Sequence, residues 1–230
     1  MNSIRVLFLA AAVLIVAPVA AMAAIVNVDH FTVSILNIDS NSQLNLTGPT
    51  SYGIIQPDVL HPNATSYDTI NGYLYTGWDG GVWDGPGIIS TGAQALGPVY
   101  TLGVYTDSDW AFAGNPATFH GQPVYANSVL TQVTLIGDAN GDGVLTGADY
   151  TYIDAAWENG YADQPCPWAL GDFNHDGLLT GDDYAWLDAA WEYTHPEAAS
   201  PLGAVPVPEP ATLVLLGMGA LVLILVRRRK

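Results

Sequence analysis

Residues 137–150 read GDANGDGVLTGADY, and residues 171–184 repeat them closely as GDFNHDGLLTGDDY. Oxygen-bearing side chains occupy the same five positions (1, 3, 5, 9 and 12) of a loop in each copy, and a glycine stands at position 6. The first loop supplies Asp138, Asn140, Asp142, Thr146 and Asp149. The second supplies Asp172, Asn174, Asp176, Thr180 and Asp183. This spacing predicts two calcium-binding loops.

The chemistry of calcium explains the spacing. Calcium takes about six to eight oxygen ligands, and alternate residues of a tight loop point inward to supply them. Position 7 adds a backbone carbonyl, here from Val144 and Leu178. Without a cation, two carboxylates about 4 Å apart repel by roughly 4 kcal/mol at an effective dielectric constant of 20. We therefore expect two calcium ions whose binding is coupled to folding, and we expect His175, at position 4, to point outward.

A helical pattern follows each loop. Tyr150, Ile153 and Trp157 recur at helical spacing after the first loop, and the segments IDAAWE and LDAAWE are near copies. The alternative is a pair of acidic turns that match by chance. A double match at fixed spacing, each followed by a helix, argues against that alternative.

The segment 137–193 resembles a type I dockerin, which has two loop–helix calcium motifs without the leading helix of an EF-hand. Aspartate at position 12 of both loops fits that form. The resemblance implies a small α domain that folds with calcium and docks onto a cohesin. Positions 10 and 11 here are Gly147-Ala148 and Gly181-Asp182, where cohesin-binding dockerins commonly carry polar pairs such as Ser-Thr. The implied partner is therefore a cohesin-like or another protein.

The charge is distributed unevenly. The formal net charge is −17, and the acidic residues lie between Asp29 and Glu209. The basic residues stand only at the ends: Arg5, Arg227, Arg228, Arg229 and Lys230. Such an interior repels polyanions, so nucleic-acid binding is excluded. The single cysteine, Cys166, excludes an internal disulfide.

The N-terminus is predicted to be a secretory signal peptide over residues 1–23. Arg5 precedes an apolar run, and Ala21-Met22-Ala23 forms a small-residue cleavage site. We expect cleavage near Ala23 or Ala24. The alternative is an uncleaved anchor, which the short apolar run disfavours.

The C-terminus is predicted to be a Pro-rich linker over 194–210 and a single transmembrane helix with a basic tail over 211–230. The apolar run from Ala211 to Val226 would span about 24 Å as a helix, and the following Arg cluster holds that end in the cytoplasm. Together with Val207-Pro208-Glu209-Pro210, these parts resemble a PEP-CTERM sorting signal. The resemblance implies processing near that motif by an exosortase-type enzyme and an envelope with an extracellular polysaccharide. The alternative is a plain single-pass anchor.

Residues 25–135 are predicted to be a mainly β module, either a β-sandwich or a short β-helix-like fold, because apolar and polar residues alternate and helical periodicity is weak. Trp-Asp-Gly occurs at 78–80 and again at 83–85. We expect a Gly-turned hairpin or loop that packs its tryptophans against the core, and the alternative is exposed rings that stack on sugars. This stretch, with the strand and repeat that follow, resembles the terminal part of large planctomycete surface proteins.

The sequence thus predicts an exported calcium-binding surface or extracellular-matrix protein without catalytic activity. Asp79 and Asp84 could be imagined as the acid and nucleophile of a glycosidase, but they are two short loop acids with no further catalytic framework. The alternative is a carbohydrate-binding or polysaccharide-degrading component that docks through the dockerin-like segment, with polysaccharide as its ligand.

Overall fold

The computed structural model describes residues 4–6, 9–10, 13–16, 25–58 and 63–196. The chain divides into two units, Met1–Thr194 and His195–Lys230. Nearly all of the second unit, including the predicted transmembrane helix and basic tail, lies outside the described residues. Among the described helices, none combines the length and the apolar character that a membrane span requires.

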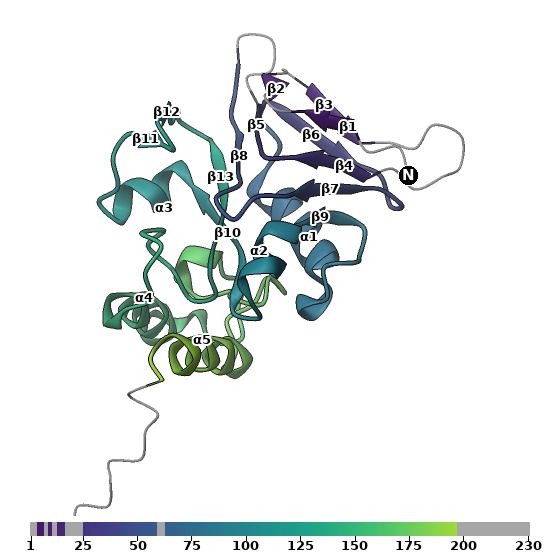
Figure 1. The fold of residues 1–230 in the computed structure, drawn as a ribbon. Helices are drawn as coiled ribbons and strands as arrows, with labels where there is room; N and C mark the ends of the chain where they lie inside the picture. The colour runs from purple at the N-terminus through teal and green to yellow at the C-terminus, as the bar shows by residue number, and fades with distance from the viewer. Residues whose placement is uncertain (1–3, 7–8, 11–12, 17–24, 59–62, 197–230) are drawn as a thin grey trace, which may run out of the picture. The chain divides into compact units, whose positions relative to one another are not determined.

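The described strands between residues 4 and 55 form stacked coils of parallel strands (Figure 1). Each of the first five strands pairs in parallel with the strand three places later, so β1 pairs with β4 and β4 with β7. This pairing corresponds to the β-helix-like alternative rather than to a sandwich, and it confirms a mainly β N-terminal region. The strands are β1 (Ile4–Val6), β2 (Leu9–Ala10), β3 (Val13–Val16), β4 (Ile25–Val28), β5 (His30–Val33), β6 (Ile35–Ile38), β7 (Gln43–Leu46) and β8 (Tyr52–Ile55).

The first coil consists of residues predicted to belong to the signal peptide. Strands β1, β2 and β3 all lie before Ala23 and form one edge of the stack. If cleavage occurs where the sequence predicts, the coil made by β4, β5 and β6 becomes the terminal one. The alternation of burial along β5 and β6, with Phe31, Val33, Leu36 and Ile38 buried, shows that these strands pack one face inward.

Three helices and five further strands complete residues 25–135. The three helices are a correction, because the weak helical periodicity of this segment predicts mainly β structure. Strands β10 and β13 pair with each other antiparallel, and β13 joins the edge of β8. The further elements are α1 (Tyr67–Trp78), β9 (Gly87–Ile89), α2 (Thr91–Leu96), β10 (Tyr100–Thr106), α3 (Asp107–Phe112), β11 (Thr118–Phe119), β12 (Gln122–Pro123) and β13 (Val129–Leu135), with a 3₁₀ turn over Asp79–Gly81.

Local signals account for these helices. Ser66 caps α1 by accepting a hydrogen bond from the Thr69 amide, and Thr106 forms a capping box with Asp109 at the start of α3. The buried side chains of α1 include Ile70, Leu74 and Trp78, which stand four residues apart on one face. The helix packs that face against β9.

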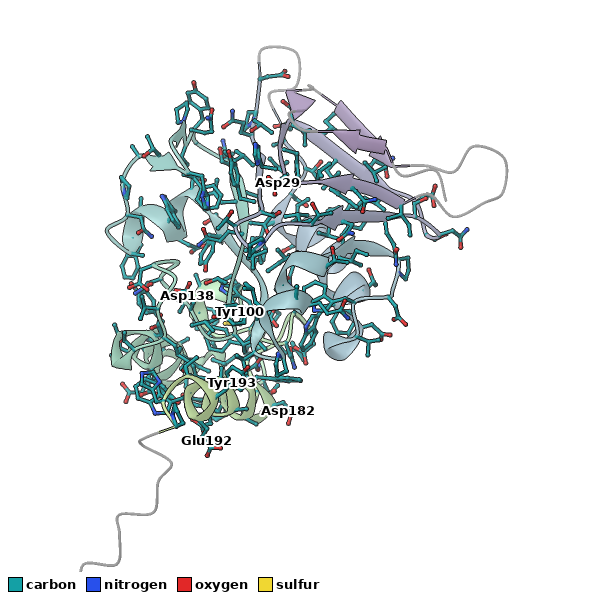
Figure 2. All side chains as sticks on the ribbon, viewed as in Figure 1. Asp29, Tyr100, Asp138, Asp182, Glu192 and Tyr193 are labelled. Atoms are coloured by element: carbon teal, nitrogen blue, oxygen red, sulfur yellow. The ribbon has the colours of Figure 1, made fainter. Side chains whose placement is uncertain are left out.

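Helices follow both acidic loops, as the sequence predicts. They are α4 (Gly147–Ala156), which continues as a π-helical turn over Trp157–Tyr161, and α5 (Gly181–Thr194), with a short 3₁₀ helix over Trp168–Leu170 between them. Two reciprocal hydrogen bonds join the helices: Tyr150 donates to Asp188 and Tyr184 donates to Asp154, each at 2.8 Å. The repeat in the sequence is therefore a repeat in the structure. Figure 2 labels Asp138, which opens the first loop, and Asp182 on α5.

Candidate metal centre

Each acidic loop is built around its first and last aspartates, which are fully buried. These are Asp138 and Asp149 in the first loop and Asp172 and Asp183 in the second. The backbone amide at position 6 donates to the first aspartate, from Gly143 at 3.0 Å and from Gly177 at 3.1 Å. The glycines adopt φ of 82° and 86°, which a side chain would disfavour.

The last aspartate ties the loop to its helix. Asp149 accepts from the amides of Ala139 at 3.1 Å and Thr146 at 2.8 Å. Asp183 accepts from the amides of Phe173 at 2.9 Å and Thr180 at 2.8 Å, so the last aspartates of the two loops accept from equivalent amides. The threonine at position 9 and the aspartate at position 12 thus lie where the helix begins.

The middle of each loop is equally alike. The position 3 amide oxygens accept from the position 5 backbone, with Asn140 to Asp142 at 2.8 Å and Asn174 to Asp176 at 2.9 Å. The asparagine nitrogens donate to the Asp142 and Asp176 carboxylates, each at 3.0 Å. Both position 5 carboxylates are exposed.

The position 7 side chains, Val144 and Leu178, point toward solvent and are 55% and 39% exposed. The structure therefore brings all twelve predicted residues into two loops of common geometry. Among the described residues, however, no group of three or more His, Cys, Asp or Glu side chains lies close enough to hold a metal ion.

Burial sets the electrostatics of the first aspartates. Desolvation raises the pKa of Asp138 from 3.8 to about 7, opposed by the hydroxyl of Thr134, which donates to this carboxylate. Desolvation likewise raises the pKa of Asp172 to about 7, opposed by the Asn71 amide. The pKa values of Asp149 and Asp183 are also raised, chiefly by burial. A nearby cation would reverse this cost, because it favours the ionised form.

His175 does not point outward as expected. Its side chain is 2% exposed, and its ring stacks on Trp168 with centroids 4.9 Å apart. Burial lowers the His175 pKa to about 3, so the imidazole is neutral. The expectation failed because α1, which lies far away in the sequence, covers this side of the loop and encloses the ring.

Sequence reasoning missed a residue on α1 that touches the second loop. Asn71 donates to Asp172 Oδ2 at 2.9 Å, and its carbonyl oxygen lies 2.9 Å from His175 Nδ1. Tyr67, also on α1, accepts from the Trp168 amide at 2.7 Å. No local sequence pattern predicts these contacts, because 101 to 104 residues separate the partners.

Side chains from residues 25–135 also donate hydrogen bonds to the backbone of the first loop. The Tyr105 hydroxyl donates to the Asp138 carbonyl at 2.8 Å, Asn115 to the Asn140 carbonyl at 2.7 Å, and Gln132 to the Gly141 carbonyl at 3.1 Å. Both acidic loops thus pack within the same compact unit as the β strands, Met1–Thr194.

The paired Trp-Asp-Gly segments are structural. Trp78 and Trp83 are 4% and 6% exposed and belong to the core, as the packing interpretation predicts. Trp78 is the last residue of α1, so a hairpin is not present at this point. The exposed sugar-stacking alternative is therefore wrong for these two rings.

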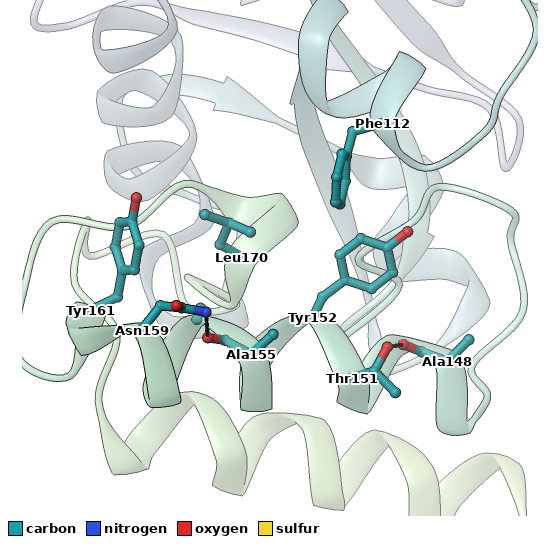
Figure 3. Close-up of a pocket in the computed structure, with 9 residues that line it drawn as sticks. Phe112, Ala148, Thr151, Tyr152, Ala155, Asn159, Tyr161 and Leu170 are labelled. Atoms are coloured by element: carbon teal, nitrogen blue, oxygen red, sulfur yellow. Dashed lines mark hydrogen bonds between the residues drawn. The ribbon is translucent and has the colours of Figure 1, made fainter.

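A groove of about 910 Å³ runs along α4 (Figure 3). Phe112 is 80% exposed there and meets Tyr152 edge to face, with ring centroids 6.3 Å apart. Tyr161 stands on the other side, as Figure 3 shows, and Asn159 lies on the helix between them. The lining residues are uncharged: Phe112, Ala148, Thr151, Tyr152, Ala155, Ala156, Asn159, Tyr161 and Leu170.

Residues 206–230 carry a PEP-CTERM protein-sorting motif. No curated protein and no solved structure matches the chain. The motif supports sorting by an exosortase-type route and implies an exported protein at the cell surface. It covers only the C-terminal end, so what the remainder of the chain does rests on the geometry above.

Proposed function

We propose that this PEP-CTERM protein is an exported, non-catalytic calcium-binding protein of the cell surface or extracellular matrix. Two observations on the second loop favour a cation. Its predicted side-chain donors are all hard oxygens, the ligand type calcium prefers. In addition, Asp172 Oδ1 is buried and has no hydrogen-bond partner among the described residues.

The hydrogen bonds that the two loops share, at positions 3, 6, 9 and 12, extend the proposal to both sites. The residues that would hold the ions are Asp138, Asn140, Asp142, Val144, Thr146 and Asp149 in the first loop and Asp172, Asn174, Asp176, Leu178, Thr180 and Asp183 in the second. Bound calcium would supply positive charge to carboxylates that burial otherwise disfavours. In this proposal calcium rigidifies α4 and α5, and the dockerin-like segment presents a surface to a cohesin-like or other protein.

Calorimetry with calcium tests the proposal. The protein from residue 24 to 200 should bind two ions, and Asp142→Ala and Asp176→Ala should each remove one. These aspartates are exposed, so their loss should spare the metal-free fold. Two ion equivalents in the wild type and one in each variant support the proposal. A calcium titration without heat, together with a melting temperature unchanged by EDTA, would contradict it.

Processing of the tail is a further part of the proposal. Mass spectrometry of the native protein should find a C-terminus near Pro208-Glu209-Pro210. An intact tail ending at Lys230 would instead indicate a plain anchor.

A second candidate function is binding of a neutral polysaccharide, favoured by the groove along α4. Aromatic rings such as Phe112 and Tyr161 offer apolar faces, while Asn159 and the tyrosine hydroxyls offer hydrogen bonds. An uncharged lining on an acidic protein suits a neutral ligand. Affinity electrophoresis in gels with a soluble neutral glucan should show retardation that Phe112→Ala with Tyr161→Ala removes.

Tyr75→Ala serves as the control for that experiment, since Tyr75 is an exposed aromatic residue on α1 outside the groove. Retardation that is absent, or equally reduced by the control, would rule out the groove as a glycan site. Release of reducing sugars from the glucan would contradict the non-catalytic assignment.

A further inference from the structure

The two loops differ at their first aspartate in spite of their common geometry. Asp138 Oδ1 accepts from the amides of Gly141 at 2.9 Å and Asp142 at 3.1 Å. The corresponding oxygen of Asp172 accepts no hydrogen bond within the described part of the chain, although the side chain is fully buried. A buried acceptor without a partner costs about 1–3 kcal/mol, so the second loop has more to gain from a cation.

The outer partners of the two aspartates also differ in origin. Thr134, which donates to Asp138, precedes it by four residues at the end of β13. Asn71, which donates to Asp172, belongs to α1 and stands 101 residues earlier in the sequence. Within the described part of the chain, only the second loop therefore has a carboxylate held by an element distant in sequence.

Asn71 uses both ends of its amide at this junction. Its nitrogen donates to Asp172 Oδ2, so its oxygen is the acceptor for the Nδ1 proton of His175. With Oδ2 held by Asn71 and by the Gly177 amide, Oδ1 is the oxygen left for another partner. Asn71 is itself 7% exposed, which leaves little freedom to rotate away.

The surroundings extend this link into the core. Trp78, at the end of α1, and the His175 ring lie in a T-shaped arrangement with centroids 6.1 Å apart. Trp168 stacks against the His175 ring, and its indole N–H donates to the Asp138 carbonyl at 3.1 Å. A movement of Asp172 would therefore change the surroundings of Trp78 and Trp168.

We propose that the second loop couples calcium binding to the packing of α1, and that Asn71 is the positioning residue that holds Asp172 ready for the ion. This inference rests on the calcium binding proposed above. Outer partners of metal ligands typically contribute about 10- to 100-fold to metal affinity, and we expect Asn71 to act in that range on the second site alone.

Single-site backgrounds isolate the effect. Asp142→Ala leaves only the second site, and Asp176→Ala leaves only the first. In the Asp142→Ala background, Asn71→Ala should weaken calcium binding about 10- to 100-fold by calorimetry. In the Asp176→Ala background, Asn71→Ala should change the calcium affinity less than about two-fold. Thr134→Val should show the opposite selectivity.

Tryptophan fluorescence gives a second readout that a general loss of stability would not mimic. In the Asp142→Ala background, calcium should change the emission, and Asn71→Ala should shift the midpoint of that change to higher calcium by the calorimetric factor. Should Asn71→Ala fail to fold, Asn71→Ser replaces it, with a smaller loss expected, because the serine hydroxyl offers a donor in place of the amide nitrogen.

Each outcome decides between the claims. If the wild type binds no calcium, the proposed function and this inference both fail. If the wild type binds two ions but Asn71→Ala weakens both sites equally, or neither, the calcium sites stand and the coupling through Asn71 is wrong.

Discussion

Replacing Asp172 by asparagine should stabilise the metal-free protein and destabilise the calcium-loaded one. Burial raises the pKa of Asp172 from 3.8 to about 7, which corresponds to roughly 4 kcal/mol of unfavourable free energy for the ionised form in the fold. Asparagine keeps the shape and removes the charge. Its carbonyl oxygen can accept from Asn71 and Gly177 as Asp172 Oδ2 does.

A cost offsets part of that gain. The asparagine nitrogen would occupy the place of Asp172 Oδ1, which has no partner among the described residues, at about 1–3 kcal/mol. We therefore expect Asp172→Asn to raise the free energy of unfolding by about 1–3 kcal/mol in EDTA at pH 8. At calcium concentrations about 100-fold above the dissociation constant, the wild type gains about 2.7 kcal/mol from each site, and the variant lacks one of these contributions.

Urea denaturation followed by tryptophan fluorescence measures both effects. The gain in EDTA should vanish near pH 4, where the folded wild type already carries the proton. Asp163→Asn is the matched control, because Asp163 is an exposed loop residue at φ 56°, a conformation that asparagine tolerates. A variant that is less stable than the wild type in EDTA at pH 8, or a gain that persists at pH 4, would refute the reasoning.

Three further predictions concern the metal-free fold. Its free energy of unfolding should fall as pH rises from about 4 to about 7, because Asp138 and Asp172 have folded-state pKa values of about 7 and keep protons that the unfolded chain has released. Urea titrations at fixed pH measure this dependence, and a flat profile would contradict the prediction. Gly77→Ala should lower the free energy of unfolding by about 1–3 kcal/mol or more in thermal melts, because its new Cβ would collide with the Ile88 carbonyl. Gly72→Ala on the same helix is the control: its Cβ meets nothing within 4 Å, so it should be neutral or stabilising. Equal melting temperatures for the two variants would be evidence against this packing. Trp168→Ala should cost about 3–5 kcal/mol in urea denaturation, as expected for a fully buried tryptophan, and a loss below 1 kcal/mol would show that the ring is not packed as described.

Local chemistry made part of the structure predictable. Loop positions 1 and 12 and the helix after each loop depend on contacts within about twelve residues, so the repeat alone located them. Helix α1 was missed although Ser66 caps it and Ile70, Leu74 and Trp78 mark one face, because a flanking run of glycines and polar residues hid that period. The α4 groove was also missed, since Phe112 and Tyr161 come from separate elements.

The sequence by itself determined where two acidic loops and their helices lie, that Lys and Arg are absent between the ends, and that the C-terminus carries a sorting motif. These features follow from short-range spacing and composition. Only the tertiary structure decided that His175 turns inward and that Asn71 reaches Asp172, because burial and hydrogen bonding across 101 residues depend on how α1 packs. The two loops are therefore alike in sequence but unequal in their surroundings.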